Sequence, residues 1–447
     1  MGSTTLKIRT NRARLAATAI AVAMMATACA ADPAETPTGD PSDDAATPTD
    51  DVTTDDSALG EVVIPAGEKI QIRSLQAISG DVAFLGVPNQ RGTELAIADF
   101  GAIEGFEVDL GTPLDDLCDS AGGQAAAQTI VADEQVVGVI GTSCSGAAVA
   151  AMPLISQAGL VMISPSNTSP SLSSDLAGTA GSDYQPGYFR TAHNDLFQGR
   201  AVAEFVFTEQ GLQTAAAIHD GDPYTQGLAQ AFADAFTELG GTVTTVTAVN
   251  KGDTDMTGVL TEVAADSPEA LFFPIFMPEG GLIAQQIGGV EGLNDTMLLS
   301  ADGLLTDNFI ELAETVGVFH SGPNLDYAGN ASVTGVSGDD FLAAYEEAYG
   351  EAPSAPFWAH SYDATALLLT AIANVATIDD DGAMRIDRQA LRDELSSTTG
   401  FAGIIGTLNC DAFGDCGAQR ISVVSHDSAD QVTAGDLTSV FEYEPAA

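Results

Sequence analysis

Small polar residues form two short turns in this sequence, and a cysteine accompanies the first. Cys118 is followed 26 positions later by residues 144–146 (Cys-Ser-Gly), and residues 164–168 (Ser-Pro-Ser-Asn-Thr) come shortly after. Open N–H groups at the start of a helix favour an anion, and serine or threonine hydroxyls add hydrogen bonds to a carboxylate. These turns therefore predict that backbone groups bind a small zwitterion.

Strands and helices must hold these turns in place. Residues 136–140 and 160–163 are short apolar runs, and helical patterns follow over 147–157 and from Pro170 onward. This order predicts that each turn joins a strand to a helix.

A series of motifs in a fixed order extends over most of the chain, from about Lys69 to Tyr443. They are Ile70-Gln71-Ile72, residues 77–80 (Ala-Ile-Ser-Gly), Gly86, residues 91–98, residues 115–119, the two turns, Phe189-Arg190-Thr191, His219-Asp220 with Tyr224 and Gly227, and residues 251–255. The series resembles the branched-chain amino-acid (Leu/Ile/Val) type of periplasmic binding protein, the type I solute receptors of ABC importers.

The expected fold class is α/β. Short Val/Ile/Leu-rich runs alternate with helical stretches from 69 to about 190 and again from 201 to about 317, which predicts two parallel units. The resemblance implies two doubly wound parallel-sheet lobes joined by a three-segment hinge, with the ligand between them. Lobe 1 is expected over 67–190 plus 327–399 and lobe 2 over 191–326 plus 400–447, with hinge crossings near 189–194, 318–327 and 399–406.

The resemblance also assigns ligand contacts. Ser145 matches the residue whose hydroxyl and N–H meet the ligand carboxylate, Ser166 offers a backbone group, and Thr168 bridges carboxylate and ammonium. Tyr224 matches the aromatic residue that closes on the ligand, and Asp302 stands where an acid pairs with the ammonium. Taken singly, these residues have ordinary alternatives: helix caps for Ser145 and Thr168, core packing for Tyr224 and a turn residue for Asp302.

Some positions depart from the family pattern. Leu85 stands where tyrosine is frequent, Phe276-Met277 replaces a Tyr-Tyr pair, and Asp302 is shorter than the usual Glu. An apolar wall from Leu85, Phe276 and Trp358 would suit an aliphatic or aromatic side chain, although Phe276 and Trp358 could equally be core residues. The candidate ligand-binding residues are Ser145, Gly146, Ser166, Thr168, Tyr224, Phe276, Asp302 and Leu85.

The N-terminus looks like a bacterial lipoprotein signal peptide. Residues 1–28 have a basic start, an apolar run from Leu15 to Met25 and Ala-Thr-Ala before Cys29. An ordinary secretory signal is the alternative. Residues 29–66 are expected to be an acidic disordered tether, so a lipid on Cys29 would anchor the exported chain to the outer face of the cytoplasmic membrane.

The other four cysteines suit two disulfides in an exported protein. Cys118 with Cys144 would stabilise the fold by about 3 to 4 kcal/mol, and Cys410 with Cys416 by about 2 kcal/mol. A metal pair is the alternative for Cys410 and Cys416, but no histidine lies within five residues of them. We expect no metal.

The charge and the motifs limit the function. A formal charge of -49, from 63 acidic and 14 basic residues, argues against nucleic acid as a partner. The expected function is a receptor that binds an amino acid, needs no cofactor and feeds an ABC permease. A sensor for a membrane kinase or chemoreceptor, or a receptor for an amide or urea-like ligand, is the alternative. Catalysis is not expected, because residues 141–145 lack the second glycine of a Gly-x-Ser-x-Gly elbow.

Overall fold

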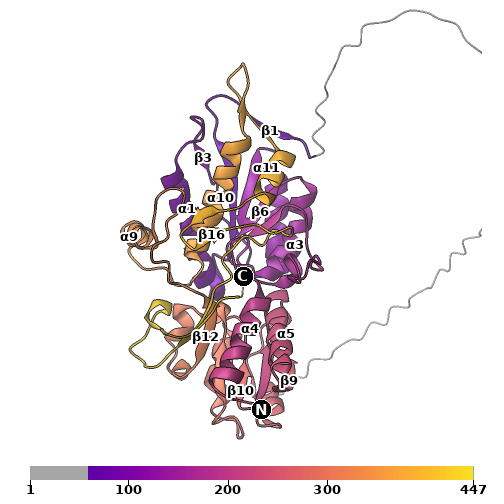
Figure 1. The fold of residues 1–447 in the computed structure, drawn as a ribbon, viewed down its shortest axis with the longest axis vertical. Helices are drawn as coiled ribbons and strands as arrows, with labels where there is room; N and C mark the ends of the chain where they lie inside the picture. The colour runs from indigo at the N-terminus through magenta and orange to yellow at the C-terminus, as the bar shows by residue number, and fades with distance from the viewer. Residues whose placement is uncertain (1–58, 446–447) are drawn as a thin grey trace, which may run out of the picture. The chain divides into compact units, whose positions relative to one another are not determined.

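The computed structural model describes residues 59–445, and its first large sheet is parallel throughout (Figure 1). The strand order is β3-β2-β5-β6-β7, and β4 also pairs with β2. The strands are β2 (Ile70–Gln76), β3 (Val108–Asp109), β4 (Leu114–Asp115), β5 (Val136–Gly141), β6 (Val161–Ser164) and β7 (Tyr188–Arg190). The helices around it are α1 (Ala83–Phe100), α2 (Ser120–Val131), α3 (Ser145–Gln157), α9 (Gly338–Tyr349), α10 (Trp358–Val375) and α11 (Arg388–Ser396).

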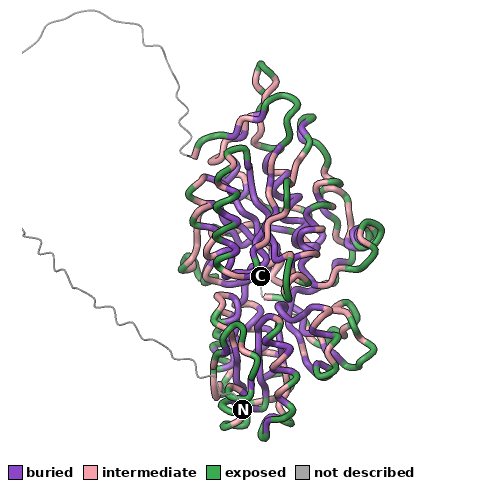
Figure 2. The backbone as a smooth tube through the Cα atoms, turned by 180° about the vertical axis from the view of Figure 1, so that it is seen from behind, coloured by how far each residue is buried: buried purple, intermediate pink, exposed green. Residues whose placement is uncertain are grey.

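Both faces of this sheet are covered, because successive side chains of a strand point to opposite sides. Val137 and Ile163 pack with residues of α1 and α10, whereas Val139 and Met162 pack with α2 and α3. All residues of β5 and β6 are buried, as the continuous purple of the central strands in Figure 2 shows. Strands buried on both faces are apolar along their whole length, which explains the apolar runs in the sequence.

The second large sheet has the order β18-β17-β12-β11-β10-β8-β9. It is parallel from β9 to β12, and β17 and β18 are antiparallel to their neighbours. The strands are β8 (Thr214–His219), β9 (Thr242–Ala248), β10 (Ala270–Phe272), β11 (Met297–Ser300), β12 (Phe319–Pro323), β17 (Ile421–Ser425) and β18 (Thr438–Tyr443). The helices are α4 (Asp195–Glu204), α5 (Pro223–Glu238), α6 (Thr257–Ala264), α7 (Glu279–Ile287) and α8 (Asp307–Ile310).

Helices cover both faces of the second sheet as well. Ala215 and Ala217 of β8 pack with α4 and α5, whereas Ala216 and Ile218 pack with α6 and α7. The predicted fold class, two doubly wound parallel-sheet lobes, is thus confirmed. The second sheet is mixed, because β17 and β18 at one edge run antiparallel to their neighbours.

The tether expected over 29–66 ends earlier than its predicted boundary. Residues 61–64 form β1 (Glu61–Ile64), which pairs with β14 (Met384–Asp387), and β14 pairs with β13 (Thr377–Ile378). Val62 and Ile64 are buried in the core of the first lobe. They belong to the folded part because they pair with β14 and are buried. No local pattern indicates this pairing, because β14 lies more than 300 residues away in the chain. The signal peptide, Cys29 and the tether up to residue 58 lie outside the described residues.

The chain passes between the two sheets three times, and the last passage comes later than expected. The first two follow β7 and β12. The third was expected near Gly400, but the hairpin of β15 (Phe401–Gly403) and β16 (Gly406–Leu408) packs into the first core through Ile404 and Leu408. Asp363 of α10 accepts the N–H groups of Ile404 and Ile405, both at 2.9 Å. Residues 401–416 therefore belong with the first sheet.

A buried ion pair joins two of these passages. Arg190, at the end of β7, is fully buried and pairs with Asp415, which is also buried. The Arg190 guanidinium donates to the carbonyl of Ser169 (2.8 Å) and the hydroxyl of Ser173 (2.7 Å). Asp415 also accepts from Asn194 Nδ2 (3.2 Å), at the start of α4. The ion pair thus links the first passage, which follows β7, to the segment that leads into the third passage.

Candidate ligand-binding site

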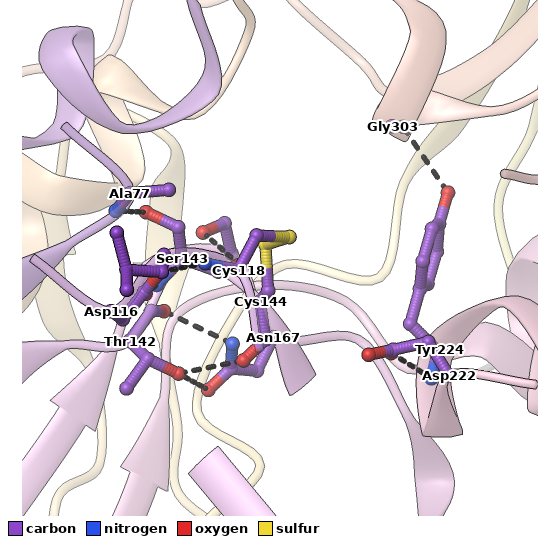
Figure 3. The surroundings of a disulfide bond; sticks show 12 residues. Ala77, Asp116, Cys118, Thr142, Ser143, Cys144, Asn167, Asp222, Tyr224 and Gly303 are labelled. Atoms are coloured by element: carbon purple, nitrogen blue, oxygen red, sulfur yellow. Dashed lines mark hydrogen bonds between the residues drawn. A yellow bond between two sulfur atoms is a disulfide. The ribbon is translucent and has the colours of Figure 1, made fainter. Parts of the chain in front are cut away.

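The turn between β5 and α3 is fixed by hydrogen bonds to neighbouring strand ends (Figure 3). The N–H of Ser143 donates to Asp116 Oδ2 (2.7 Å), and Ser143 Oγ accepts from the N–H of Ala77 (3.0 Å). Helix α3 then begins at Ser145, with Cys144 as its N-cap residue and no side-chain cap of its own. Its first N–H groups are therefore available to an acceptor from elsewhere.

Both predicted disulfides are present. Cys118 bonds to Cys144, and Cys410 bonds to Cys416, which excludes a metal pair at the second. Beside the first disulfide, Asp116 Oδ1 accepts from the N–H of Cys118 (2.7 Å). Burial raises the pKa of Asp116 to about 7, although hydrogen bonds from three backbone N–H groups oppose the shift.

We expect the double variant Cys118→Ser, Cys144→Ser to lose about 3 to 4 kcal/mol of unfolding free energy, because the disulfide closes a long loop in the unfolded chain. Chemical denaturation would measure the loss. The matched variant Cys410→Ser, Cys416→Ser should lose only about 2 kcal/mol, since its loop is shorter. Equal losses in the two variants would contradict loop closure as the cause.

The second turn packs directly against the first. Ser166 Oγ donates to the carbonyl of Ser143 (3.0 Å), and the Ser169 N–H lies 3.4 Å from its acceptor, Ser145 Oγ. The Thr168 hydroxyl is buried beside the carboxylate of Asp195, at the start of α4. The pKa of Asp195 is raised well above its ordinary value, first by burial and next by the charge of Asp302.

Tyr224 and Asp302 are the second sheet's contribution. The Tyr224 hydroxyl donates to Asp302 Oδ1 (3.2 Å) and accepts from the N–H of Gly303 (3.1 Å), the bond drawn in Figure 3. Gln198 Nε2 also donates to Asp302 Oδ1 (2.8 Å). Burial raises the pKa of Asp302 to about 6, and the bonds from Gln198 and Tyr224 oppose the shift. Phe276 packs on Tyr224, with ring centroids 5.2 Å apart.

One small cavity brings residues of both sheets together. It is lined by Leu85, Ser143, Cys144, Ser145, Ser166, Tyr224, Phe276, Asp302, Gly303 and Phe357. Its volume is about 20 Å³, which is room for about one water molecule. An amino acid therefore requires the two lobes to separate, or side chains to move, before it can enter.

Six of the eight candidate residues line this cavity, and two do not. Gly146 faces Asp222 instead, and Thr168, the last residue of the second turn, is buried beside Asp195. Trp358 is not part of the cavity wall, because its ring stacks on Phe341 in the first core (centroids 4.6 Å apart). Its neighbour Phe357 lines the cavity in its place.

Four residues that line this cavity were not among the candidates: Ser143, Cys144, Gly303 and Phe357. Gln198, which donates to Asp302, and Asp195, whose pKa the charge of Asp302 raises, were not among them either. The sequence offered one signal for Phe357, because this residue is next to Trp358, the candidate for the apolar wall of the site. Helix α10 begins at Trp358, so adjacent side chains there point in different directions.

The described residues also bear on metal binding and membrane insertion. Between residues 59 and 445, no group of three or more His, Cys, Asp or Glu side chains is arranged to hold a metal ion. In the same range, no helix combines the length and apolar character needed to cross a bilayer.

A sequence profile of the periplasmic binding proteins matches residues 69–425. The chain therefore belongs to the periplasmic binding protein family. The Leu/Ile/Val-binding protein homolog 3 of Brucella melitensis is 27% identical over 363 residues, which cover 80% of this chain and 91% of the relative. An amino acid binding protein of Pseudomonas aeruginosa is 29% identical over 242 residues, 54% of this chain and 61% of that relative.

Comparison with solved structures supports the same family. The crystal structure of a leucine binding protein from Thermotoga maritima matches with a TM-score of 0.70 and 25% identity, over 84% of this chain and 99% of that one. The resemblance to type I periplasmic binding proteins is confirmed. Members of this family are substrate-binding proteins of transporters, not enzymes, and the family implies an extracytoplasmic location.

Proposed function

We propose that this periplasmic binding protein binds an amino acid with an apolar side chain, branched-chain or similar, between its lobes and delivers it to an ABC permease. The observation that carries the proposal is the shared cavity of Ser145, Tyr224 and Asp302. The start of α3 offers N–H donors for a carboxylate, and Asp302 offers a negative charge for an ammonium group. Leu85, Phe276 and Phe357 supply apolar surface. The names of the Brucella and Thermotoga relatives point to the same ligand class.

Membrane attachment is part of the proposal. Ala-Thr-Ala before Cys29 supports lipidation of that cysteine. A lipid on Cys29 would keep the receptor near the permease in the cytoplasmic membrane.

A thermal-shift screen tests the ligand class. The purified protein would be screened against the twenty amino acids, urea, short amides and polyamines. A ligand in large excess over its dissociation constant should stabilise the protein by about 3 to 4 kcal/mol. A melting-temperature rise with an apolar amino acid is the expected result. A rise only with amides or other non-zwitterions would contradict the amino-acid assignment.

Affinity should depend on pH through Asp302. Only the ionised carboxylate attracts an ammonium group, and burial raises the pKa of Asp302 to about 6 in the absence of a ligand. Affinity should therefore level off about one pH unit above this pKa and fall by up to about tenfold per pH unit below it. Calorimetric titrations between pH 4.5 and 8 would measure this. In Asp302→Asn, the part of the pH dependence of affinity that comes from the Asp302 carboxylate should disappear.

A further inference from the structure

Gln198 of α4 uses both polar atoms of its side chain amide in hydrogen bonds. Its Nε2 donates to Asp302 Oδ1 (2.8 Å) and to Ser321 Oγ (3.0 Å). Its Oε1 lies 2.6 Å from His193 Nε2. All four residues are buried, so water does not compete for these bonds. Gln198 thus connects a buried histidine to the acid that lines the cavity.

The partners of Gln198 decide which way its amide points, and they also decide the tautomer of His193. An ionised Asp302 only accepts hydrogen bonds, so the amide nitrogen must face it and the amide oxygen must face His193. Because that oxygen is an acceptor, His193 Nε2 carries the proton. His193 Nδ1, which has no hydrogen-bond partner between residues 59 and 445, is the unprotonated nitrogen. Burial lowers the pKa of His193 to about 4, so the ring is neutral at pH 7.

The opposite orientation of the amide requires a different charge at Asp302. With the amide turned over, the oxygen of Gln198 would face Asp302 Oδ1, and these two acceptors repel each other unless the acid holds a proton. His193 Nε2 would then have to accept a hydrogen bond instead of donating one. The proton on His193, the orientation of Gln198 and the charge of Asp302 are therefore coupled through two consecutive hydrogen bonds.

The two oxygens of Asp302 have different surroundings. Oδ1 accepts from Gln198 and from the hydroxyl of Tyr224 (3.2 Å), whereas Oδ2 accepts from no other side chain in the described part of the protein. Asp302 lines the cavity, so Oδ2 is the oxygen that remains for a ligand. Phe357, another residue of the cavity wall, stacks on the ring of His193 (centroids 6.1 Å apart). His193 and Gln198 thus lie directly behind the wall of the cavity.

Given the amino-acid receptor proposed above, on which this step rests, we infer that Gln198 and His193 are positioning residues for the ammonium group of the ligand. Gln198 holds Asp302 by Oδ1 and leaves Oδ2 to the ammonium group. His193 keeps the amide of Gln198 in the orientation that stabilises a carboxylate. With the amide turned over, Asp302 would be a neutral acid and would lose its attraction for a cation.

Three substitutions separate positioning from general damage to the fold. Gln198→Met keeps the length of the side chain but donates no hydrogen bond. His193→Phe keeps a flat ring against Phe357 but has no N–H for Gln198, whereas His193→Gln restores an N–H donor. Gln230→Met is the matched control, because Gln230 makes an exposed glutamine–aspartate bond to Asp234 (2.7 Å) outside the cavity.

Carbon-13 NMR of the aspartate carboxyl groups in the full-length protein, without ligand, tests the charge of Asp302. Its signal is identified by its absence in Asp302→Asn. The pKa of Asp302 should rise by at least about one pH unit in Gln198→Met and by about half a unit in His193→Phe, because both variants lose a bond that favours the carboxylate. In His193→Gln and Gln230→Met it should stay within about 0.3 units of the wild type.

A pKa of Asp302 within about 0.3 units of the wild type in both Gln198→Met and His193→Phe would overturn the inference. If Gln198→Met does not fold, His193→Phe and its rescue by His193→Gln decide the result alone. The other ionisable groups nearby are unchanged in these variants, so differences between variants isolate the substituted bond. These groups are Asp195 and Tyr224 beside Asp302, and Arg190, Asp415 and His360 around His193.

Calorimetric titration with leucine at pH 7 tests the positioning itself. Gln198→Met should weaken leucine binding at least about tenfold, whereas His193→Gln and Gln230→Met should bind leucine as the wild type does. Wild-type affinity in Gln198→Met would overturn the positioning role. Failure of the wild type to bind any amino acid would instead refute the proposed function, and the NMR titration would still decide whether Gln198 and His193 keep Asp302 ionised.

Discussion

Asp302→Asn is expected to weaken the binding of an amino acid about 100-fold, the largest effect on binding that we predict. The substitution removes the buried negative charge that faces the ligand's ammonium group, and losing one partner of such a pair costs about 2 to 5 kcal/mol. Asparagine keeps the shape of the side chain and can still accept from Gln198 and Tyr224 through its oxygen. Isothermal titration calorimetry with leucine would measure the change.

The control for this prediction is Asp326→Asn, an exposed acid that does not line the cavity. It should bind leucine with wild-type affinity, which would show that loss of net charge alone has no effect. If Asp302→Asn bound leucine within about threefold of the wild type, Asp302 would not pair with the ammonium group.

Asp415→Asn is expected to lower the free energy of unfolding by about 3 to 5 kcal/mol. The variant leaves the guanidinium of Arg190, which is fully buried, without its opposite charge, and an unpaired buried charge is strongly destabilising. Denaturant unfolding followed by circular dichroism would measure the loss.

Two further variants check the cause of this loss. Arg190→Met combined with Asp415→Leu should recover much of it, because an apolar pair needs no compensating charge. Glu61→Gln removes one partner of the exposed pair between Glu61 and Arg385 and should cost less than about 1 kcal/mol. A loss as large in Glu61→Gln as in Asp415→Asn would contradict burial as the reason.

Local patterns predicted the alternation of strands and helices, and the family resemblance supplied six of the residues that line the cavity. The apolar runs at 136–140 and 160–163 correspond to strands β5 and β6, whose residues are all buried. The carboxyl ends of parallel strands meet at one edge of a sheet, so turns that follow two such strands lie close together. The contact between Ser166 and Ser143 is a direct consequence.

Segments whose partners are distant in the chain were harder to predict. Val62 and Ile64 form only a four-residue strand, and no local pattern shows that it pairs with residues 384–387. The hairpin of residues 401–408 was assigned to the second lobe by its position in the chain. It joins the first because Asp363 of α10 binds its N–H groups.

The sequence by itself determined the alternation of strands and helices, the two disulfides and the residue types at the strand ends, because each of these is encoded in short stretches of chain. Only the tertiary structure decided that Phe357 rather than Trp358 faces the cavity, and that Asp222 occupies the start of α3. Which side chain fills a space depends on how two lobes distant in sequence close on each other. That closure brings Asp222 to Gly146, 76 positions away in the chain.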